Sequence, residues 1–302
     1  MTAAITHAAW LKAPETQKLL AALEAARVGG SRFVGGCVRN TLIGAPVDDL
    51  DIATQLTPQE VIAVATKAGF AAHPTGIAHG TITVIANHKP FEVTTLRRDV
   101  STDGRHATVA FSDDWREDAA RRDFTMNAMY MDHSGAVFDY FGGQADIAQQ
   151  RVRFIGDAAT RITEDGLRIL RFFRFLASHG KPPADAAALE AIAEKKGMIA
   201  QLSGERIANE MRKLLGAENP SYALRLMAEQ GIAPLIFGRE IDASRMIRLH
   251  MLENQADYQC SVWARALVSF LVMGLVVVAV LLLLPLPAFY GRSWAVVVVM
   301  LA

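Results

Sequence analysis

Cysteine is almost absent from this chain of 302 residues, which carries only Cys37 and Cys260. Two thiols so far apart, without a CxxC pair, exclude a cysteine zinc site and a disulfide framework, and we expect both to be reduced. Charged residues are equally scarce at the C-terminal end of the sequence, where Arg265 and Arg292 are the only two from position 258 onward. The 31 basic and 31 acidic side chains therefore belong mostly to the first 257 residues, which excludes a strongly basic or disordered protein.

Common nucleotide and zinc motifs are missing as well. The sequence contains no GxxxxGK[ST] loop, no GxGxxG after a strand and no HxE with PCxxC, and its eight histidines have no metal-ligand spacing. The first 13 residues lack the basic start and the uninterrupted apolar run of a secretory signal peptide. We therefore expect a cytoplasmic catalytic region without P-loop chemistry.

Hydrophobic periodicity predicts an α+β arrangement for the first half of the chain and helices for the second. Strands are expected over 31–34, 50–53, 80–85, 91–95 and 137–140, and helices over 14–27, 37–43, 57–69 and 115–130. Thr57 with Glu60 forms a capping-box pattern. The polar segment 99–106 predicts a mobile loop. From 146 to 257 the pattern is helical, with breaks at 181–183, at Gly216 and at 231–234.

Asp49-Leu50-Asp51 is the sharpest local feature of the sequence. On a strand, residues i and i+2 point to the same face with roughly 7 Å between their Cα atoms, so two carboxylates can converge on a divalent cation such as Mg²⁺. The alternative is that two aspartates at a strand end merely face water. The pair follows a strand, Gly35-Gly36 and a helix that carries Arg39, a unit suited to a phosphate because glycine lets backbone N–H groups approach it.

Five motifs in one order resemble the class II tRNA nucleotidyltransferases and bacterial poly(A) polymerases of the polymerase-β-like superfamily. They are Gly35-Gly36-Cys37-Val38-Arg39-Asn40 with Asp49-Leu50-Asp51, then Arg121-Arg122-Asp123-Phe124-Thr125-Met126-Asn127, Asp139-Tyr140-Phe141-Gly142-Gly143, Glu164-Asp165-Gly166-Leu167-Arg168-Ile169-Leu170-Arg171 and Glu205-Arg206-Ile207-Ala208-Asn209-Glu210. The resemblance implies an α+β fold, with a nucleotidyltransferase head built on a small mixed sheet with helices. An all-α neck and a truncated helical body would follow, and then a hydrophobic C-terminal helix.

The resemblance also implies chemistry for these residues. Two Mg²⁺ ions held by Asp49 and Asp51 would assist transfer of a nucleotide from CTP or ATP to the 3′-hydroxyl of an RNA, with release of pyrophosphate. Glu92 is either a third catalytic carboxylate or a hydrogen-bonding support for the first pair or for a nearby arginine. The side chains expected to hold the sugar and phosphates of the nucleotide are Arg122, Asp123 and Asn127. Arg121 either joins them or is a solvated helix residue.

The fourth motif predicts selection of the nucleobase by protein side chains. If Asp165 and Arg168 share a helix face, a carboxylate acceptor lies beside a guanidinium donor, and this pair suits the Watson–Crick edges of C and A but not of U and G. Glu164 would orient Arg168, and Arg171 would support the phosphates or the base pocket. An ordinary surface ion pair is the alternative for such spacing in isolation.

Three candidate functions remain open at this point. Residues 75–84 and 91–97 are similar to CCA-adding enzymes, which extend the 3′ end of tRNA, and 55–69 lacks the basic segment of the bacterial poly(A) polymerase branch. CCA addition or repair is therefore favoured over addition of AMP to other RNA 3′ ends. A catalytically crippled, RNA-binding remnant is the third candidate, because the helical pattern stops near Asp257, before the family's C-terminal half.

These considerations divide the chain into a head over 1–145, a neck for nucleobase selection over 146–215, the start of a body over 216–257 and a hydrophobic tail over 258–302. Within the tail, 266–284 is 19 uncharged residues, about 28 Å as a helix, which is enough to cross a bilayer core. The tail is a membrane anchor, a buried core helix, or a segment foreign to the family that a frameshift or fusion introduced.

Overall fold

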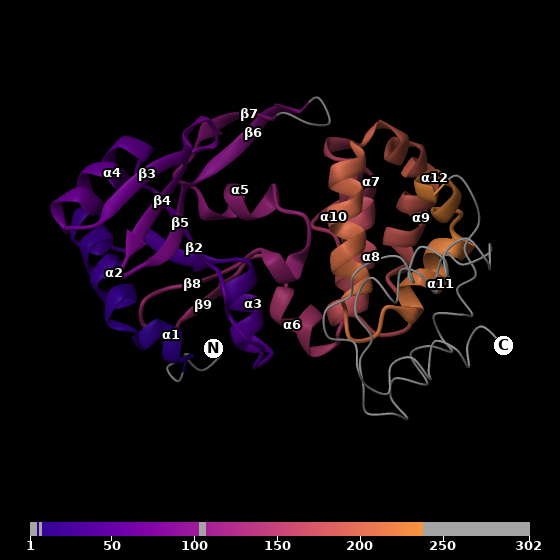
Figure 1. Cartoon of the computed structure of the whole chain (residues 1–302), viewed down its shortest axis with the longest axis horizontal. Coiled ribbons are helices and arrows are strands. Elements are labelled where there is room, and N and C mark those ends of the chain that lie inside the picture. The colour runs from indigo at the N-terminus through magenta and orange to yellow at the C-terminus, as the bar shows by residue number, and fades with distance from the viewer. Residues whose placement is uncertain (1–4, 6–7, 103–106, 238–302) are drawn as a thin grey trace, which may run out of the picture. The chain divides into compact units, whose positions relative to one another are not determined.

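The computed structural model describes residues 5, 8–102 and 107–237, which divide into two compact units by their internal contacts. The first unit comprises the described residues up to 168 together with 183–191. The second comprises 169–182 with 192–237. All the strands belong to the first unit, and the second is helical (Figure 1).

A seven-stranded mixed sheet organises the first unit, in the order β3-β4-β5-β2-β1-β8-β9. Its strands are β1 (Ser31–Val34), β2 (Leu50–Thr54), β3 (Ala71–Gly76), β4 (Thr81–Ala86), β5 (Lys89–Thr95), β8 (Met129–Met131) and β9 (Val137–Asp139). A separate hairpin pairs β6 (Arg97–Thr102) with β7 (Ala107–Phe111). Within the sheet β2 and β5 run parallel, and the other neighbours are antiparallel. The parallel pair places Asp51 directly opposite Glu92.

The two faces of this sheet are covered differently, because side chains alternate along each strand. Leu50, Ile52 and Phe91 point to the face where α2 (Pro14–Ala26) and α4 (Pro58–Lys67) pack, and they are at most 2% exposed. Figure 1 shows α2 and α4 along this side of the strands. On the opposite face α5 (Trp115–Ala120) covers a smaller core that contains Val34 and Ala53. Asp51, which alternates with Leu50 and Ile52, belongs to this second face.

The remaining helices are divided between the two units. In the first unit they are α1 (Ala9–Lys12), α3 (Gly36–Leu42), α6 (Gly143–Ala148), α7 (Ala158–Glu164) and the 3₁₀ turns Ile77–His79 and Thr125–Asn127. α8 (Leu167–His179) and α9 (Ala186–Lys195) contribute residues to both units. The second unit adds the 3₁₀ turn Lys196–Gln201, α10 (Gly204–Leu215), α11 (Ser221–Glu229) and α12 (Ala233–Phe237).

Most local predictions from the sequence are confirmed, as is the α+β fold. β1, β2, β4, β5 and β9 lie where alternation predicts them, and α2 and α3 match within two residues. The capping box at the start of α4 is present, since Thr57 accepts from the Glu60 amide and Glu60 accepts from the Thr57 amide. Asn87 and His88 both have positive φ, 49° and 62°, as a tight hairpin turn requires.

Two local predictions are wrong, and one strand was not predicted. The helix expected over 115–130 ends at Ala120, because the chain turns at Asp123, whose carboxylate accepts the Phe124 amide, and enters β8. The loop expected over 99–106 is partly strand, since β6 runs to Thr102 and β7 begins at Ala107. The strand β3 has no predicted counterpart, because its side chains are mostly exposed and show no apolar alternation.

The hydrophobic tail falls outside the described residues, and so does its segment 266–284. No helix within the described ranges has the length and apolar content that crossing a membrane requires. Of the two cysteines, Cys37 is a buried free thiol whose pKa is raised to about 12 by burial, and Cys260 lies in the undescribed part.

Candidate active site

The carboxylates predicted from the DxD motif lie at the start of β2, a central strand of the sheet. Asp49 is exposed just before β2, and Asp51 is partly buried on it, opposite Glu92 of β5. Burial raises the pKa of Asp51 to about 6, and the negative charges of Glu92 and Asp49 add to this effect, whereas Arg122 opposes it. The four side chains are therefore close enough to interact electrostatically. A bound cation would relieve the repulsion among the three carboxylates.

The donor set suits a hard divalent cation, since Asp49 and Asp51 offer carboxylate oxygens just before β2 and at its second residue. In the described part of the chain, no three His, Cys, Asp or Glu side chains come together as a group that could hold a metal ion. The structure thus offers a pair of carboxylates, and Glu92 as a third ligand stays a prediction.

Gly35 and Gly36 join β1 to α3 beneath two arginines. Gly35 has φ +73°, and a Cβ there would lie 3.7 Å from Nη1 of Arg122, while a Cβ on Gly36 would lie 3.8 Å from Nη2 of Arg39. The missing side chains thus leave space in front of both guanidinium groups. The Gly35 amide donates to the Met129 carbonyl over 3.3 Å, so it belongs to the sheet and is not available to a phosphate.

Asp118 gathers the two arginines of the Arg-Arg-Asp motif around one buried carboxylate. Its Oδ1 accepts from Nε and Nη2 of Arg121 at 2.9 and 2.7 Å, and its Oδ2 accepts from Nη2 of Arg122 at 3.1 Å and from the Tyr130 hydroxyl at 2.7 Å. Burial alone would raise the pKa of Asp118, but the charges of Arg122 and Arg121 bring it well below its usual range. Arg121 is therefore not a solvated helix residue, because its side chain is 15% exposed and paired.

A second network joins the same motif to α3. Asp123 accepts from Nδ2 of Asn127 over 3.1 Å, and Oδ1 of Asn127 accepts from Nη1 of Arg39 over 2.5 Å. Nε and Nη2 of Arg39 donate to Oδ1 of Asn40 at 3.1 and 2.9 Å. These bonds connect three predicted nucleotide-binding residues from two motifs that are about 85 positions apart in the sequence. Asn40 supplies the acceptor that fixes the orientation of Arg39.

The predicted neck motif begins in the first unit and contacts the Arg-Arg-Asp segment there. Arg168 donates from Nη1 to Glu164 over 2.5 Å and from Nη2 to the Arg121 carbonyl over 3.1 Å. Glu164 also pairs with Arg161, whose Nη1 donates to the Ala120 carbonyl over 2.8 Å. This direct contact supports the prediction that Glu164 orients Arg168.

One premise about this motif is wrong. Asp165 does not share a helix face with Arg168, because it lies in an extended break between α7 and α8, with φ −157° and ψ 109°. Its Oδ1 accepts the Leu167 amide over 3.0 Å at the start of α8. An aspartate can bond to nearby backbone amides in this way, which favours a helix boundary over a helix interior.

Arg171 is the one predicted site residue that belongs to the second unit. Its Nη1 lies 3.9 Å from Oε1 of Glu210, which also accepts from Nε of Arg174 over 2.6 Å. Glu210 is 4% exposed, so the last residue of the fifth motif anchors Arg171 of the fourth motif together with Arg174, one turn further along α8.

Sequence analysis missed three residues of this arrangement, Asp118, Tyr130 and Arg161. Asp118 had a usable signal, since it precedes Arg121 and Arg122 by three and four positions, the spacing at which charged pairs meet on a helix. Arg161 has the same relation to Glu164, which pairs in turn with Arg168. Tyr130 gave no local signal, because its contact with Asp118 joins β8 to α5.

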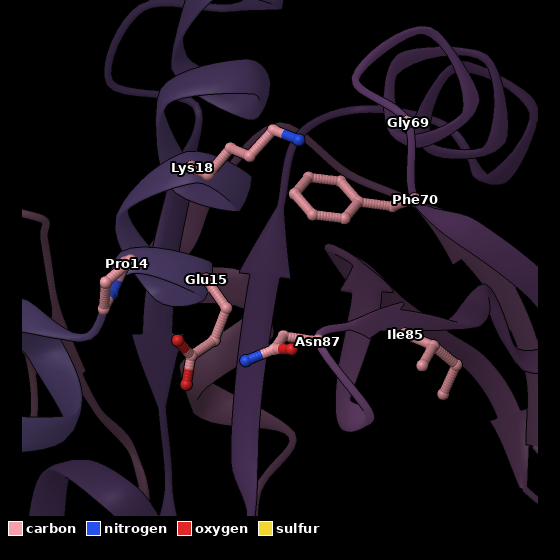
Figure 2. Close-up of a pocket in the computed structure, with 7 residues that line it drawn as sticks. All are labelled: Pro14, Glu15, Lys18, Gly69, Phe70, Ile85 and Asn87. Atoms are coloured by element: carbon pink, nitrogen blue, oxygen red, sulfur yellow. The ribbon is translucent and has the colours of Figure 1, made fainter.

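A separate pocket of about 500 Å³ opens beside α2 and contains none of the predicted site residues. Figure 2 shows the ammonium group of Lys18 near the ring of Phe70, with Glu15 and Asn87 below. Lys18 lies 4.8 Å from the centre of that ring. This pocket is therefore not part of the carboxylate and arginine cluster.

Comparison with known families agrees with this geometry. Residues 31–153 match the poly A polymerase head domain, and residues 185–244 match the probable RNA and SrmB-binding site of polymerase A. The first match contains both Asp49-Leu50-Asp51 and the Arg-Arg-Asp segment. The chain belongs to the family of tRNA nucleotidyltransferases and poly(A) polymerases that the motifs indicated.

Among the relatives, the mitochondrial CCA tRNA nucleotidyltransferase 1 of Mus musculus is 46% identical over 208 residues, which are 68% of this chain and 48% of that protein. The CCA-adding enzyme of Geobacillus stearothermophilus is 39% identical over 213 residues, 69% of this chain and 52% of the enzyme. The crystal structure of the Bacillus stearothermophilus CCA-adding enzyme in complex with CTP is 36% identical, with a TM-score of 0.66, and covers 75% of this chain and 55% of that one. The chain thus spans about half the length of the curated relatives it matches.

Proposed function

We propose that this chain transfers CMP and AMP from CTP and ATP to the 3′ end of tRNA, as part of CCA addition or repair. The observation that carries the proposal is the pair Asp49 and Asp51, set beside Glu92 and within electrostatic reach of Arg122. Relatives named CCA-adding enzymes support the choice of tRNA, and one of them was crystallised with CTP.

In the proposed reaction, the 3′-hydroxyl oxygen of the RNA bonds to the α-phosphorus of the nucleotide. The bond from that phosphorus to the oxygen bridging the α- and β-phosphates breaks, pyrophosphate leaves, and the hydroxyl proton passes to solvent. Asp49 and Asp51 would hold two Mg²⁺ ions, which lower the pKa of the hydroxyl and stabilise the leaving oxygen. Arg39 and Arg122, above Gly35 and Gly36, supply positive charge for the triphosphate.

We assign the remaining site residues their roles from the hydrogen bonds that they make. Asp123 and Asn127 hold Arg39 and contribute to the sugar and phosphate site. Glu164 orients Arg168, which donates hydrogen bonds to the base. Asp165 supplies the carboxylate that accepts a hydrogen bond from the base. Arg171 supports the nucleotide, as the resemblance implies. We keep the division into a head over 1–145, a neck over 146–215, the start of a body over 216–257 and a tail over 258–302.

Product sequencing tests this function. The full chain is incubated with Mg²⁺ and all four nucleoside triphosphates, with one sample containing tRNA that lacks its CCA end and another containing an unrelated RNA. The proposal predicts addition of C and A to the tRNA alone. Oligo(A) on both RNAs would identify a poly(A) polymerase, and nucleotide binding without any incorporation would identify a noncatalytic member of the family.

A further inference from the structure

The end of α5 is held by two arginines that come from α7 and the start of α8. The last four carbonyls of a helix have no partner within it, and here two consecutive ones are satisfied by guanidinium groups. The Ala120 carbonyl accepts from Nη1 of Arg161 at 2.8 Å, and the Arg121 carbonyl accepts from Nη2 of Arg168 at 3.1 Å. The two residues that carry these carbonyls come directly before Arg122 and Asp123 in the sequence.

One carboxylate connects the two arginines. Glu164 accepts from Arg161 through Oε1 and from Arg168 through Oε2, and all three side chains are less than 20% exposed. Nη1 of Arg168 donates in addition to the Arg161 carbonyl over 2.9 Å. Two positive charges thus share one negative charge, and the carbonyls of Ala120 and Arg121 accept from the same two arginines, so each group depends on the others for its orientation.

The hydrogen bonds of Arg168 determine which of its donors remain. A guanidinium group has five N–H hydrogens. Its contacts with Glu164, the Arg161 carbonyl and the Arg121 carbonyl use both hydrogens of Nη1 and one of Nη2. Within the described residues, these bonds leave the Nε hydrogen and the second Nη2 hydrogen as donors. A planar pair of donors suits two acceptors on the edge of a nucleobase.

We propose that Arg161 is a positioning residue for nucleobase selection. It holds Glu164 on one side, so that Glu164 fixes the plane of Arg168, and it anchors the group to the segment that carries Arg122. Arg161 touches neither base nor phosphate in this scheme, and its effect on base selection passes through Glu164 and Arg168. The inference rests on the proposed function, because it assigns Arg168 to base selection.

Binding selectivity of the full chain tests the inference. Dissociation constants of CTP, ATP, UTP and GTP are measured with Mg²⁺ for the wild type and for Arg161→Gln, together with that of inorganic tripolyphosphate. We expect the preference for CTP and ATP over UTP and GTP to fall about tenfold in Arg161→Gln, since the plane of Arg168 is no longer fixed. The affinity for tripolyphosphate should change less than about twofold.

Three variants separate positioning from a general structural effect. Arg27→Gln makes the same chemical change at a surface pair, in which Arg27 lies 3.0 Å from Asp113, and should leave the preference unchanged. In a Glu164→Gln background, Arg161→Gln should add no further loss, because both act through one carboxylate. Arg161→Lys keeps the charge without the planar fork, so it should retain only part of the preference, and it also serves if Arg161→Gln does not fold.

An unchanged preference in Arg161→Gln would overturn the inference, and so would equal weakening of all five ligands or additive losses in the double variant. Nucleotide transfer by the wild type is measured separately. A wild type that prefers CTP and ATP but transfers nothing contradicts the proposed transfer alone, and the test of Arg161 then stands by itself. A wild type that binds the four nucleotides equally contradicts the inference as well.

Discussion

Asp118 and Arg122 lie four residues apart, and the buried carboxylate of Asp118 accepts a hydrogen bond from Nη2 of Arg122 over 3.1 Å. The same carboxylate binds Arg121 and the Tyr130 hydroxyl. One anion therefore sets the direction of an arginine whose positive charge acts on Asp51, and this relation makes Asp118 a support of the site that never needs to touch substrate.

Replacement of Asp118 by asparagine should destabilise the protein by about 3 kcal/mol at neutral pH, because two arginines lose a buried partner. The pKa of Asp118 is lowered by folding, so its stabilisation is complete above about pH 4 and is lost as pH falls below that value. The difference between wild type and variant should shrink by about 1 kcal/mol per pH unit below 4. Urea denaturation at several pH values measures it.

Asp113→Asn provides the control for this change. Asp113 pairs with Arg27 at the surface, where its side chain is 70% exposed, so its loss should cost less than about 1 kcal/mol. Equal destabilisation of Asp118→Asn at pH 7 and pH 3 would show that its charge does not act as described.

Asp51→Asn should have the opposite effect on stability. Burial and the neighbouring carboxylates raise the pKa of Asp51 to about 6 in the folded protein, so its ionised form weakens the metal-free fold. The wild type should lose stability as pH rises through 6, and the variant should not. With a chelator present at pH 7.5, we expect the variant to be about 1–2 kcal/mol more stable in thermal denaturation, after allowance for partial exposure.

Asp48→Asn is the matched control, since Asp48 is an exposed neighbour in the same segment. It should leave the stability of the chelated protein unchanged. Addition of Mg²⁺ should stabilise the wild type and Asp48→Asn but not Asp51→Asn. A chelated Asp51→Asn protein that is less stable than the wild type at pH 7.5 would contradict the repulsion among the carboxylates.

The two glycines before α3 should respond differently to alanine. Gly35 has φ +73° and ψ −122°, a conformation that strains any other residue, so Gly35→Ala should cost about 1–3 kcal/mol. Gly36 begins α3, and a Cβ there meets only Nη2 of Arg39 at 3.8 Å, so Gly36→Ala should change stability by less than about 0.5 kcal/mol.

Triphosphate affinity separates the effects further. If the phosphates approach the backbone beneath Arg39, Gly36→Ala should weaken tripolyphosphate binding severalfold although the fold is intact. An unchanged affinity in Gly36→Ala would place the triphosphate away from this turn.

Features that depend on neighbouring residues could be predicted from the sequence. The Thr57–Glu60 capping box and the strand-glycine-helix unit around Gly35 follow from local hydrogen bonding and backbone preference, and both are present. The position of Asp51 likewise follows from strand alternation, which places it on the face opposite Leu50, whereas Asp49 lies just before β2.

Features that depend on distant partners could not be predicted in this way. The expected helix 115–130 fails because Phe124 pairs with Phe154 and β8 joins the sheet beside β1, contacts that local periodicity does not contain. The hairpin β6–β7 was not predicted because it pairs outside the seven-stranded sheet and because the polar segment 99–106 includes most of β6. The bonds from Arg161 and Arg168 to the end of α5 span more than 40 residues.

Transfer of nucleotide by the intact chain tests the central claim most directly. Labelled CTP is supplied with Mg²⁺ and tRNA lacking its CCA end, and labelled tRNA and pyrophosphate are measured for the wild type and for Asp49→Asn with Asp51→Asn. The account predicts equal amounts of the two products from the wild type and neither from the variant. Label transfer that persists in the double variant, or a wild type that binds CTP and releases no pyrophosphate, would contradict it.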